Sequence, residues 1–273
     1  MTTARICSSI SVWRAVLVFE GDGPFRGFSE AVIIDVETTG LDPKKDRIVS
    51  VGAVRVDFRR FIAHSGDEVK TYYCTVNPEC RIPAAASAVH GITDAHVAGE
   101  ERFADIVDGL RDFVGSRPLI AHNCTFDRSF IDAECRRATK PRLTTTGWYC
   151  TMERMCFYER TRGNVRSRIG LQEAAELMCM PAHTSAYHNA LQDALITMQL
   201  AAGIYMLDNK LEVGSQPSRG AAQNLAPLSS TIAASSRSAF EPANGTGSPQ
   251  GSSSVFNIIN IIPRWLSWLK IMR

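Results

Sequence analysis

The sequence predicts an α/β fold in which a mixed five-stranded sheet is flanked by helices. Five short apolar segments, rich in β-branched or aromatic residues, are typical of buried strands. Four longer segments repeat apolar residues at helical spacing. Three strands come first and the other two alternate with helices, an order that predicts a mixed sheet covered by helices.

The first three strands lie close together in the sequence. An apolar run predicts a buried strand at residues 31–36, which the turn-forming residues 40–43 end. Alternating apolar residues predict a second strand at 48–56, and a third is expected at 72–76. The polar residues 63–67 between them are expected to form a hairpin loop.

Helices and strands then alternate along the chain. Phe103, Ile106, Leu110 and Phe113 recur at helical spacing and predict a helix at 103–114. Strands are expected at 118–122 and 148–151, and helices at 126–138, 171–180 and 189–207. The apolar stripe of the last helix is expected at Leu191, Leu195, Met198 and Ala202.

Composition divides the chain into four stretches. Residues 1–30 lack a clear period and form an N-terminal extension, either a short ordered segment, a disordered arm or an overextended start. Residues 31–208 form the globular domain. Residues 209–254 are rich in Ser, Ala, Gly, Pro and Gln and are expected to be a flexible linker. Residues 255–273 are predicted to form an amphipathic segment.

The amphipathic C-terminal segment has two interpretations. Trp265, Trp268, Leu269 and Met272 share one helical face and basic residues lie nearby, which is typical of an anchor for a partner protein or a membrane surface. The alternative is that the segment folds back onto the domain or is adventitious sequence. Stable membrane insertion is not expected, because no run looks long enough to span a bilayer.

Length, net charge and cysteine content are compatible with many classes of globular protein. The chain has 273 residues, 45% of them hydrophobic, which is enough to bury a core without disulfides. Its net charge of +2 neither indicates nor excludes a nucleic-acid partner, because only a local basic stripe would matter. The eight cysteines form no Cys-x-x-Cys pair, and small buried thiols fit a reducing cytoplasm.

Two acids on the first strand are the strongest chemical signal. Asp35 and Glu37 are two residues apart, so their side chains point to the same face. Like charges this close repel, and both stay ionised only with a cation between them. Oxygen ligands of this kind suit Mg²⁺ or Mn²⁺. The alternative is a solvated acidic strand end.

Two later motifs add acids and a histidine. Asp127 is expected in the first turn of a helix that follows a short strand, where the helix dipole favours an anion. His188 precedes the last helix and Asp193 lies about one turn inside it. A neutral histidine beside a metal site is a natural general base. Each motif alone is also compatible with ordinary surface residues.

Taken together, these residues resemble a known family. Asp35, Glu37, Asp127, Asp193 and His188 match the DEDDh 3′→5′ exonuclease superfamily. The run from Asp35 to Pro43 is most similar to its DnaQ-like branch, typified by the epsilon proofreading subunit of bacterial DNA polymerase III, and residues 89–93 match a further motif of that branch. The resemblance covers about residues 31–208, so it identifies this segment as an exonuclease domain.

The resemblance implies a ribonuclease-H-like fold and a two-metal centre with two Mg²⁺ or Mn²⁺ ions. Asp35, Glu37 and Asp193 would be the principal ligands, Asp127 would assist through water, and His188 would take the proton from the attacking water. The residues that would contact the terminal nucleotide are Thr38, Thr39, Leu41, His90 and Phe126. Simple packing is the alternative role for Leu41 and Phe126.

Two positions refine the resemblance. A sister branch has a tyrosine four residues before the last aspartate, where this chain has Asn189, so the histidine branch is favoured. The family often has a glutamate five residues before the middle-motif histidine, where this chain has Ala85. That change removes one expected substrate contact without touching the metal centre.

A basic stretch follows the second motif and predicts a path for a nucleic-acid backbone. A solvated charged surface is the alternative. The basic residues are Arg136, Arg137, Lys140, Arg142, Arg154, Arg160, Arg162, Arg166 and Arg168.

We therefore expect a 3′→5′ exonuclease that releases nucleoside 5′-monophosphates from single-stranded or frayed DNA 3′ ends, in proofreading or repair. An RNA 3′-end trimming enzyme is one alternative. A non-catalytic nucleic-acid- or polymerase-binding module is another, and the presence of all five catalytic residues argues against it. The C-terminal segment is the candidate contact with a polymerase or other protein.

Overall fold

The computed structural model describes residues 23–64, 69–178, 180 and 188–211. The amphipathic segment 255–273 and all but the start of the expected linker lie outside these residues. The division of the chain into extension, domain, linker and C-terminal segment therefore stays a prediction.

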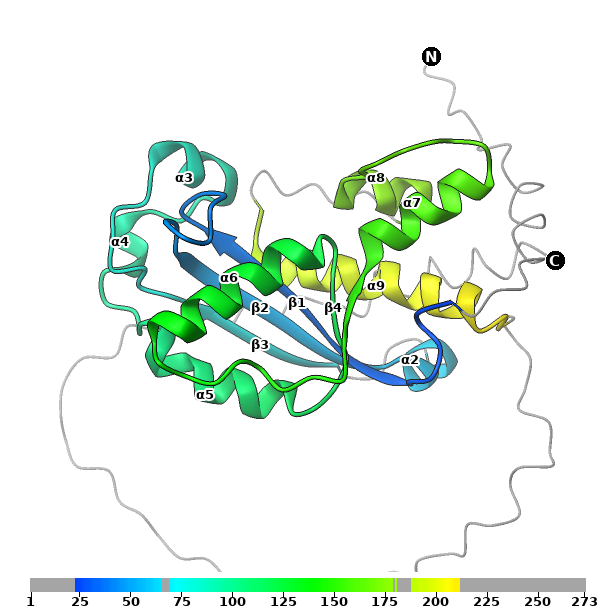
Figure 1. Ribbon diagram of the computed structural model, residues 1–273, viewed down its shortest axis with the longest axis horizontal. Helices are drawn as coiled ribbons and strands as arrows, with labels where there is room; N and C mark the ends of the chain where they lie inside the picture. Colours follow the sequence, from blue (N-terminus) through cyan, green and yellow to red (C-terminus); the bar gives the residue numbers. More distant parts are fainter. Residues whose placement is uncertain (1–22, 65–68, 179, 181–187, 212–273) are drawn as a thin grey trace, which may run out of the picture.

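A five-stranded mixed sheet forms the centre of the domain (Figure 1). The strand order is β3-β2-β1-β4-β5, with β2 antiparallel to β1 and β3, and β4 parallel to β1 and β5. This arrangement confirms the predicted fold class. The strands are β1 (Glu30–Thr38), β2 (Ile48–Asp57), β3 (Lys70–Thr75), β4 (Leu119–Ala121) and β5 (Trp148–Cys150).

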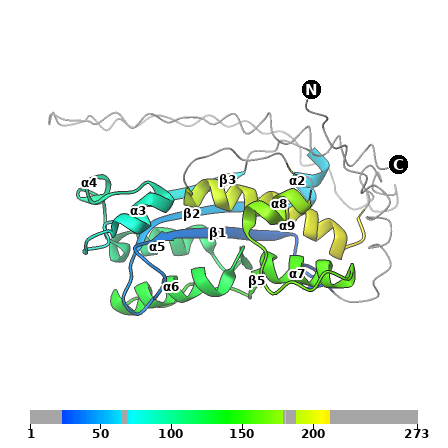
Figure 2. The ribbon, with the colours of Figure 1, turned by 90° about the horizontal axis from the view of Figure 1, so that it is seen from above.

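Helices cover both faces of the sheet. Helices α5 (Phe103–Val114) and α6 (Cys124–Arg137) lie on one face, and α9 (Ala190–Asp208) lies on the other (Figures 1 and 2). Successive residues of β1 supply the two cores, because side chains alternate along a strand. Ile33 belongs to the apolar cluster that includes α9, whereas Ile34 belongs to the cluster that includes α5 and α6.

Helix α9 is buried on nearly all sides rather than along one stripe. Met198 and Ala202 are buried as predicted, but the predicted stripe residues Leu191 and Leu195 are only partly buried. By length and composition alone α9 could cross a membrane, which the sequence analysis did not anticipate. Within the domain, 72% of its apolar window is buried, so α9 packs as a core helix.

Four short helices were not predicted. Helix α2 (Phe58–His64) takes the place of the start of the expected hairpin loop at 63–67, so that expectation was wrong for its first residues. The Asp57 carboxylate accepts the amide N–H groups of Arg59 and Arg60 at 3.0 and 3.2 Å and so caps α2. The others are α3 (Ala84–His90), α4 (Asp94–Val97) and α7 (Thr151–Thr161), while the predicted helix at 171–180 is α8 (Leu171–Leu177).

The first described residues pack against the end of α9. Phe25 is fully buried, and its amide N–H donates to the Asp208 carboxylate at 3.3 Å. The same buried carboxylate accepts from Tyr158 at 2.5 Å and from Arg154 Nε at 3.0 Å. Asp208 thus joins residues 23–28 to α7 and α9.

The six cysteines in the described ranges are free thiols. Cys135, Cys150 and Cys156 are buried, as expected for small core residues. Cys80 is exposed, unlike the small buried thiols that were expected.

Candidate active site

The acidic pair lies where β1 extends beyond β4. Strand β1 pairs with β4 at Val32 and Ile33, and β4 ends at Ala121. The Val36 N–H on this open edge of β1 donates instead to Asp127 Oδ1 at 3.2 Å. Because a buried N–H needs an acceptor, this bond places Asp127 directly beside the strand that carries Asp35 and Glu37.

Asp127 comes from the first turn of α6, as predicted. Its side chain is buried, and burial raises its pKa to about 7, while N–H bonds from its own backbone and from Val36 oppose that rise. A buried carboxyl group with so high a pKa is costly to ionise without a cation nearby.

Asp193 and His188 lie at the start of α9. The Asn189 side chain caps this helix, accepting the amide N–H groups of Leu191 and Gln192 at 3.1 Å each. His188 Nδ1 lies 3.1 Å from Asp193 Oδ2. The His188 side chain is 66% exposed and Asp193 is 16% exposed, so the imidazole faces solvent above a half-buried acid.

The carboxylates shift one another's ionisation. Burial first, then Asp127, Glu37 and Asp193, raise the pKa of Asp35 well above its ordinary value. Burial and the Asp193 charge raise the pKa of Glu37 to about 7, and His188 acts against that rise. Repulsion of this kind is what a divalent cation between the acids would relieve.

These residues fit a divalent-metal site. One ligand atom each from Glu37, His188 and Asp193 lies within 4.8 Å of the others, the one such group among the residues that the structure describes. Asp35 and Asp127 adjoin this group, as their mutual charge effects show. The structure therefore brings together all five residues of the predicted catalytic set, from β1, α6 and the start of α9.

The turn after β1 presents three predicted substrate contacts. Thr38 Oγ1 donates to the Gly40 carbonyl at 2.6 Å, and the Arg47 N–H donates to Thr39 Oγ1 at 3.0 Å. Leu41 is 84% exposed, so simple packing does not explain this apolar side chain. The bonded turn holds Leu41 in solvent beside the end of β1.

His90 and Phe126 are less exposed than Leu41. His90 is buried at the end of α3, where its Nδ1 accepts the Ile92 N–H at 3.0 Å. Burial lowers the pKa of His90, which favours the neutral imidazole. Phe126 is half-buried with its ring centroid 4.8 Å from that of Phe130, so packing accounts for much of its position.

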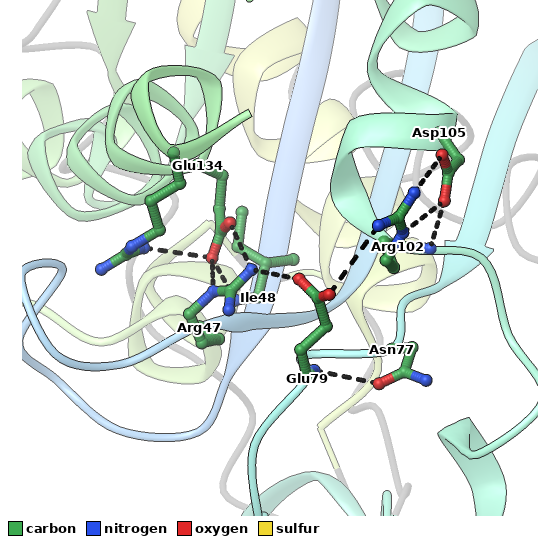
Figure 3. Close-up of polar contacts among 8 residues, drawn as sticks. Arg47, Ile48, Asn77, Glu79, Arg102, Asp105 and Glu134 are labelled. Atoms are coloured by element: carbon green, nitrogen blue, oxygen red, sulfur yellow. Dashed lines mark hydrogen bonds and ion pairs between the residues drawn. The ribbon is translucent and has the colours of Figure 1, made fainter. Parts of the chain in front are cut away.

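A charged network behind the β1–β2 turn was not predicted (Figure 3). Glu134 of α6 is 1% exposed, and its carboxylate accepts from Arg47 Nε at 2.7 Å and Nη2 at 3.1 Å. It also accepts the Ile48 N–H at 3.3 Å. Glu134 follows Phe130 and Ile131 at helical spacing, so its place on the buried face of α6 was the available signal.

The predicted basic path is largely neutralised by ion pairs. Acids from other parts of the chain, among them Glu173 and Asp208, pair with its arginines. Six of the nine basic residues have a carboxylate partner. These pairs are Arg137–Glu134, Lys140–Asp108, Arg142–Asp132, Arg154–Asp208, Arg162–Glu159 and Arg166–Glu173.

Known proteins have similar sequences. A sequence model of the exonuclease family RNase_T matches residues 32–201. The chain is 32% identical over 168 residues to the DNA polymerase III subunit epsilon of Treponema pallidum (strain Nichols), covering 61% of this chain and 72% of that protein.

Two solved structures have a similar fold. The nuclease domain of 3′hExo, a DEDDh family member bound to rAMP, has a TM-score of 0.53 at 17% identity, covering 69% of this chain and 96% of that chain. Exonuclease I of E. coli in complex with a dT13 oligonucleotide has a TM-score of 0.52 at 18% identity, covering 67% and 42%.

Sequence, fold and site geometry agree. The mixed sheet with helices on both faces is the ribonuclease-H-like arrangement that the resemblance implied. The acids of β1, α6 and α9 lie together with His188, in the order that the DEDDh pattern requires. The chain therefore belongs to the RNase_T exonuclease family, as a DnaQ-like nuclease of the DEDDh type.

Proposed function

We propose that this protein is a metal-dependent 3′→5′ DNA exonuclease that releases nucleoside 5′-monophosphates, in proofreading or repair. One observation carries the proposal: four carboxyl groups from three elements converge beside a solvent-facing histidine. The DNA substrate is supported by the relative from Treponema pallidum, which is named as a DNA polymerase subunit.

Asp35, Glu37, Asp127 and Asp193 would hold two Mg²⁺ or Mn²⁺ ions. Bound divalent ions would activate water and stabilise the leaving 3′ oxygen of a phosphodiester. The raised pKa values of Glu37 and Asp127 support this role, because acids that ionise reluctantly alone become good ligands once a cation offsets their repulsion.

His188 would act as the general base. Its Nδ1 is engaged with the Asp193 carboxylate, which favours the tautomer that carries the proton on Nδ1. Nε2 is then left with a lone pair that can accept a proton from the attacking water. The 66% exposure of the side chain gives it access to a bound strand end.

The terminal nucleotide would lie between the β1–β2 turn and α3. Leu41 projects into solvent on one side, and the buried His90, whose pKa is lowered by burial, lies on the other. We propose that Leu41 contacts the terminal base, while Thr38 and Thr39 keep the turn in place through their hydroxyl bonds. Phe126 would border the same pocket.

Cellular context belongs to the proposal as well. A reducing cytoplasm is consistent with the free thiols of the described residues. The C-terminal segment 255–273 would join the nuclease to a polymerase or another protein. Its sequence pattern of aromatic and basic residues supports an anchoring role.

The test compares the wild type with Asp35→Ala on three labelled substrates: single-stranded DNA, mispaired duplex DNA and short RNA. Reactions contain Mg²⁺, Mn²⁺ or a chelator. We expect Asp35→Ala to lower kcat about 10³-fold, while Asp112→Ala, an exposed acid of α5, keeps wild-type activity. Activity that survives chelation would refute the mechanism, and faster cleavage of RNA would establish the trimming alternative.

A further inference from the structure

The start of α9 lies directly on β2 at Gly52. A Cβ atom at position 52 would come within 3.0 Å of the Ala190 carbonyl group and the Leu191 nitrogen, all of them backbone atoms. Backbone cannot rotate away as a flexible side chain can, so any larger residue forces α9 and β2 apart. This contact therefore requires glycine.

Gly52 also lies beside the catalytic acids. It is the β2 partner of Asp35 in β1 and of Tyr73 in β3. Partners directly opposite each other in antiparallel strands point to the same face, so Asp35, position 52 and Tyr73 form one row across the sheet. The first turn of α9 crosses this row at the glycine.

Two further contacts hold the residues just before α9. The His188 N–H donates to the Val89 carbonyl of α3 at 3.1 Å. The Asn189 side chain, which caps α9, also lies near the Tyr73 hydroxyl of β3: burial raises the pKa of Tyr73, and Asn189 acts against that rise. Residues 188–190 are thus held by α3 and β2, with Tyr73 of β3 beside them.

We propose that Gly52 and Tyr73 are positioning residues for the catalytic centre: together they set where the first turn of α9 holds His188 and Asp193 relative to Asp35. This inference rests on the proposed function. Gly52 would not touch substrate, because the start of α9 lies directly on it. Their effect would pass through the backbone of residues 188–193.

The expected effect follows from geometry. Relieving the Gly52→Ala overlap needs a shift of α9 on the order of 1 Å. A misplacement of this size can cost about 10²-fold in rate, because metal ligands and a general base must keep their spacing. Substrate affinity should change little, since Leu41 and the β1–β2 turn lie beyond the Asp35–Gly52 pair, past the end of β1.

The first experiment compares Gly52→Ala with Gly109→Ala. At position 109, in α5, the added methyl meets only the Tyr72 side chain at 3.8 and 3.9 Å, an ordinary contact. We expect Gly52→Ala to lower kcat by about 10²-fold with KM within about threefold, and to weaken Mn²⁺ binding measured by electron paramagnetic resonance. Gly109→Ala should match the wild type.

The second experiment uses two adjacent tyrosines of β3. Tyr73→Phe removes the hydroxyl that lies near the Asn189 side chain, whereas Tyr72→Phe removes one that donates to the Ile106 carbonyl at 3.1 Å on the opposite face. Tyr73→Phe should lower kcat about fivefold at unchanged Tm. Tyr72→Phe should lower Tm by about 4 °C at unchanged kcat.

The activity and Mn²⁺-binding measurements test the proposed function and the positioning role separately. A wild-type protein that lacks metal-dependent nuclease activity would refute the proposed function, and the Mn²⁺ affinities would still test the positioning role. Wild-type kcat and Mn²⁺ affinity in Gly52→Ala would overturn that role. If Gly52→Ala does not fold, the tyrosine pair decides, and equal kcat for Tyr73→Phe and Tyr72→Phe overturns it.

Discussion

At the scale of single residues, the Arg47–Glu134 pair shows how a buried charge supports the site from behind. Arg47 ends the turn that carries Thr39 and Leu41, and its guanidinium makes two bonds to the Glu134 carboxylate (Figure 3). Those bonds raise the pKa of Arg47. Arg137 and the Ile48 N–H complete the environment of the carboxylate.

We expect Arg47→Ala to lower the free energy of unfolding by about 3 kcal/mol, because it leaves a buried carboxylate with an incomplete set of partners. Chemical denaturation measures this loss. The matched control is Arg102→Ala, which removes an exposed arginine from the same network and should leave the denaturation midpoint unchanged. Equal midpoints for both variants would contradict the assigned role of the pair.

Residue types and spacing predicted the catalytic residues but not the Arg47–Glu134 pair behind them. Asp35 and Glu37 could be paired from the sequence because a strand alternates every two residues. Glu134 was overlooked, because nothing local shows that an arginine 87 positions earlier would neutralise it. The same limit applied to the basic path, whose acid partners Asp108 and Asp208 come from other helices.

At the scale of elements, periodicity predicted α5, α6, α8 and α9 and missed α2, α3, α4 and α7. Helix α5 has the predicted bounds because its buried residues, such as Phe103, Ile106 and Leu110, keep one face. Helix α3 offers no such signal, since His90 is its only buried residue. Helix α2 has a signal that was not used, a capping aspartate followed by Phe58 and Phe61.

That cap predicts a measurable contribution to stability. Asp57→Ala removes the acceptor for two amide N–H groups of α2 and should cost about 1 kcal/mol in thermal or chemical unfolding. Asp57→Asn retains a side-chain oxygen and should stay close to the wild type. An asparagine variant as unstable as the alanine variant would show that the carboxylate charge, rather than the cap, matters.

At the scale of the whole molecule, the carboxyl groups that are hardest to ionise lie together at the catalytic centre. One strand and two helices that are far apart in the sequence supply the four acids: β1 carries two of them, and α6 and α9 carry one each. The core around them is apolar on both faces of the sheet. The strand order and the meeting of the four acids depend on contacts between distant segments. Patterns within each single segment of the sequence do not predict such contacts.

The centre should therefore make stability depend on pH and metal. The pKa values of Glu37 and Asp127 are raised in the folded state to about 7, so the folded protein holds protons that the unfolded chain has released. Their stabilising effect is complete below the ordinary carboxyl pKa and is lost as pH rises through about 7. The buried His90, whose pKa is lowered, acts in the opposite direction below its ordinary pKa.

For metal-free protein we expect the free energy of unfolding to fall by about 2 kcal/mol between pH 6 and pH 8. Asp127→Asn keeps an oxygen that can accept the Val36 N–H but cannot ionise, so it should flatten this slope and raise Tm at pH 8. Saturating Mg²⁺ should stabilise the wild type most at pH 8 and the variant much less, because binding adds stability in proportion to its affinity. Calorimetry at both pH values, with and without Mg²⁺, measures these differences. Parallel slopes for the two proteins would mean that Asp127 does not carry the linkage, and the cost of holding unneutralised acids would have to lie in Asp35 and Glu37 alone.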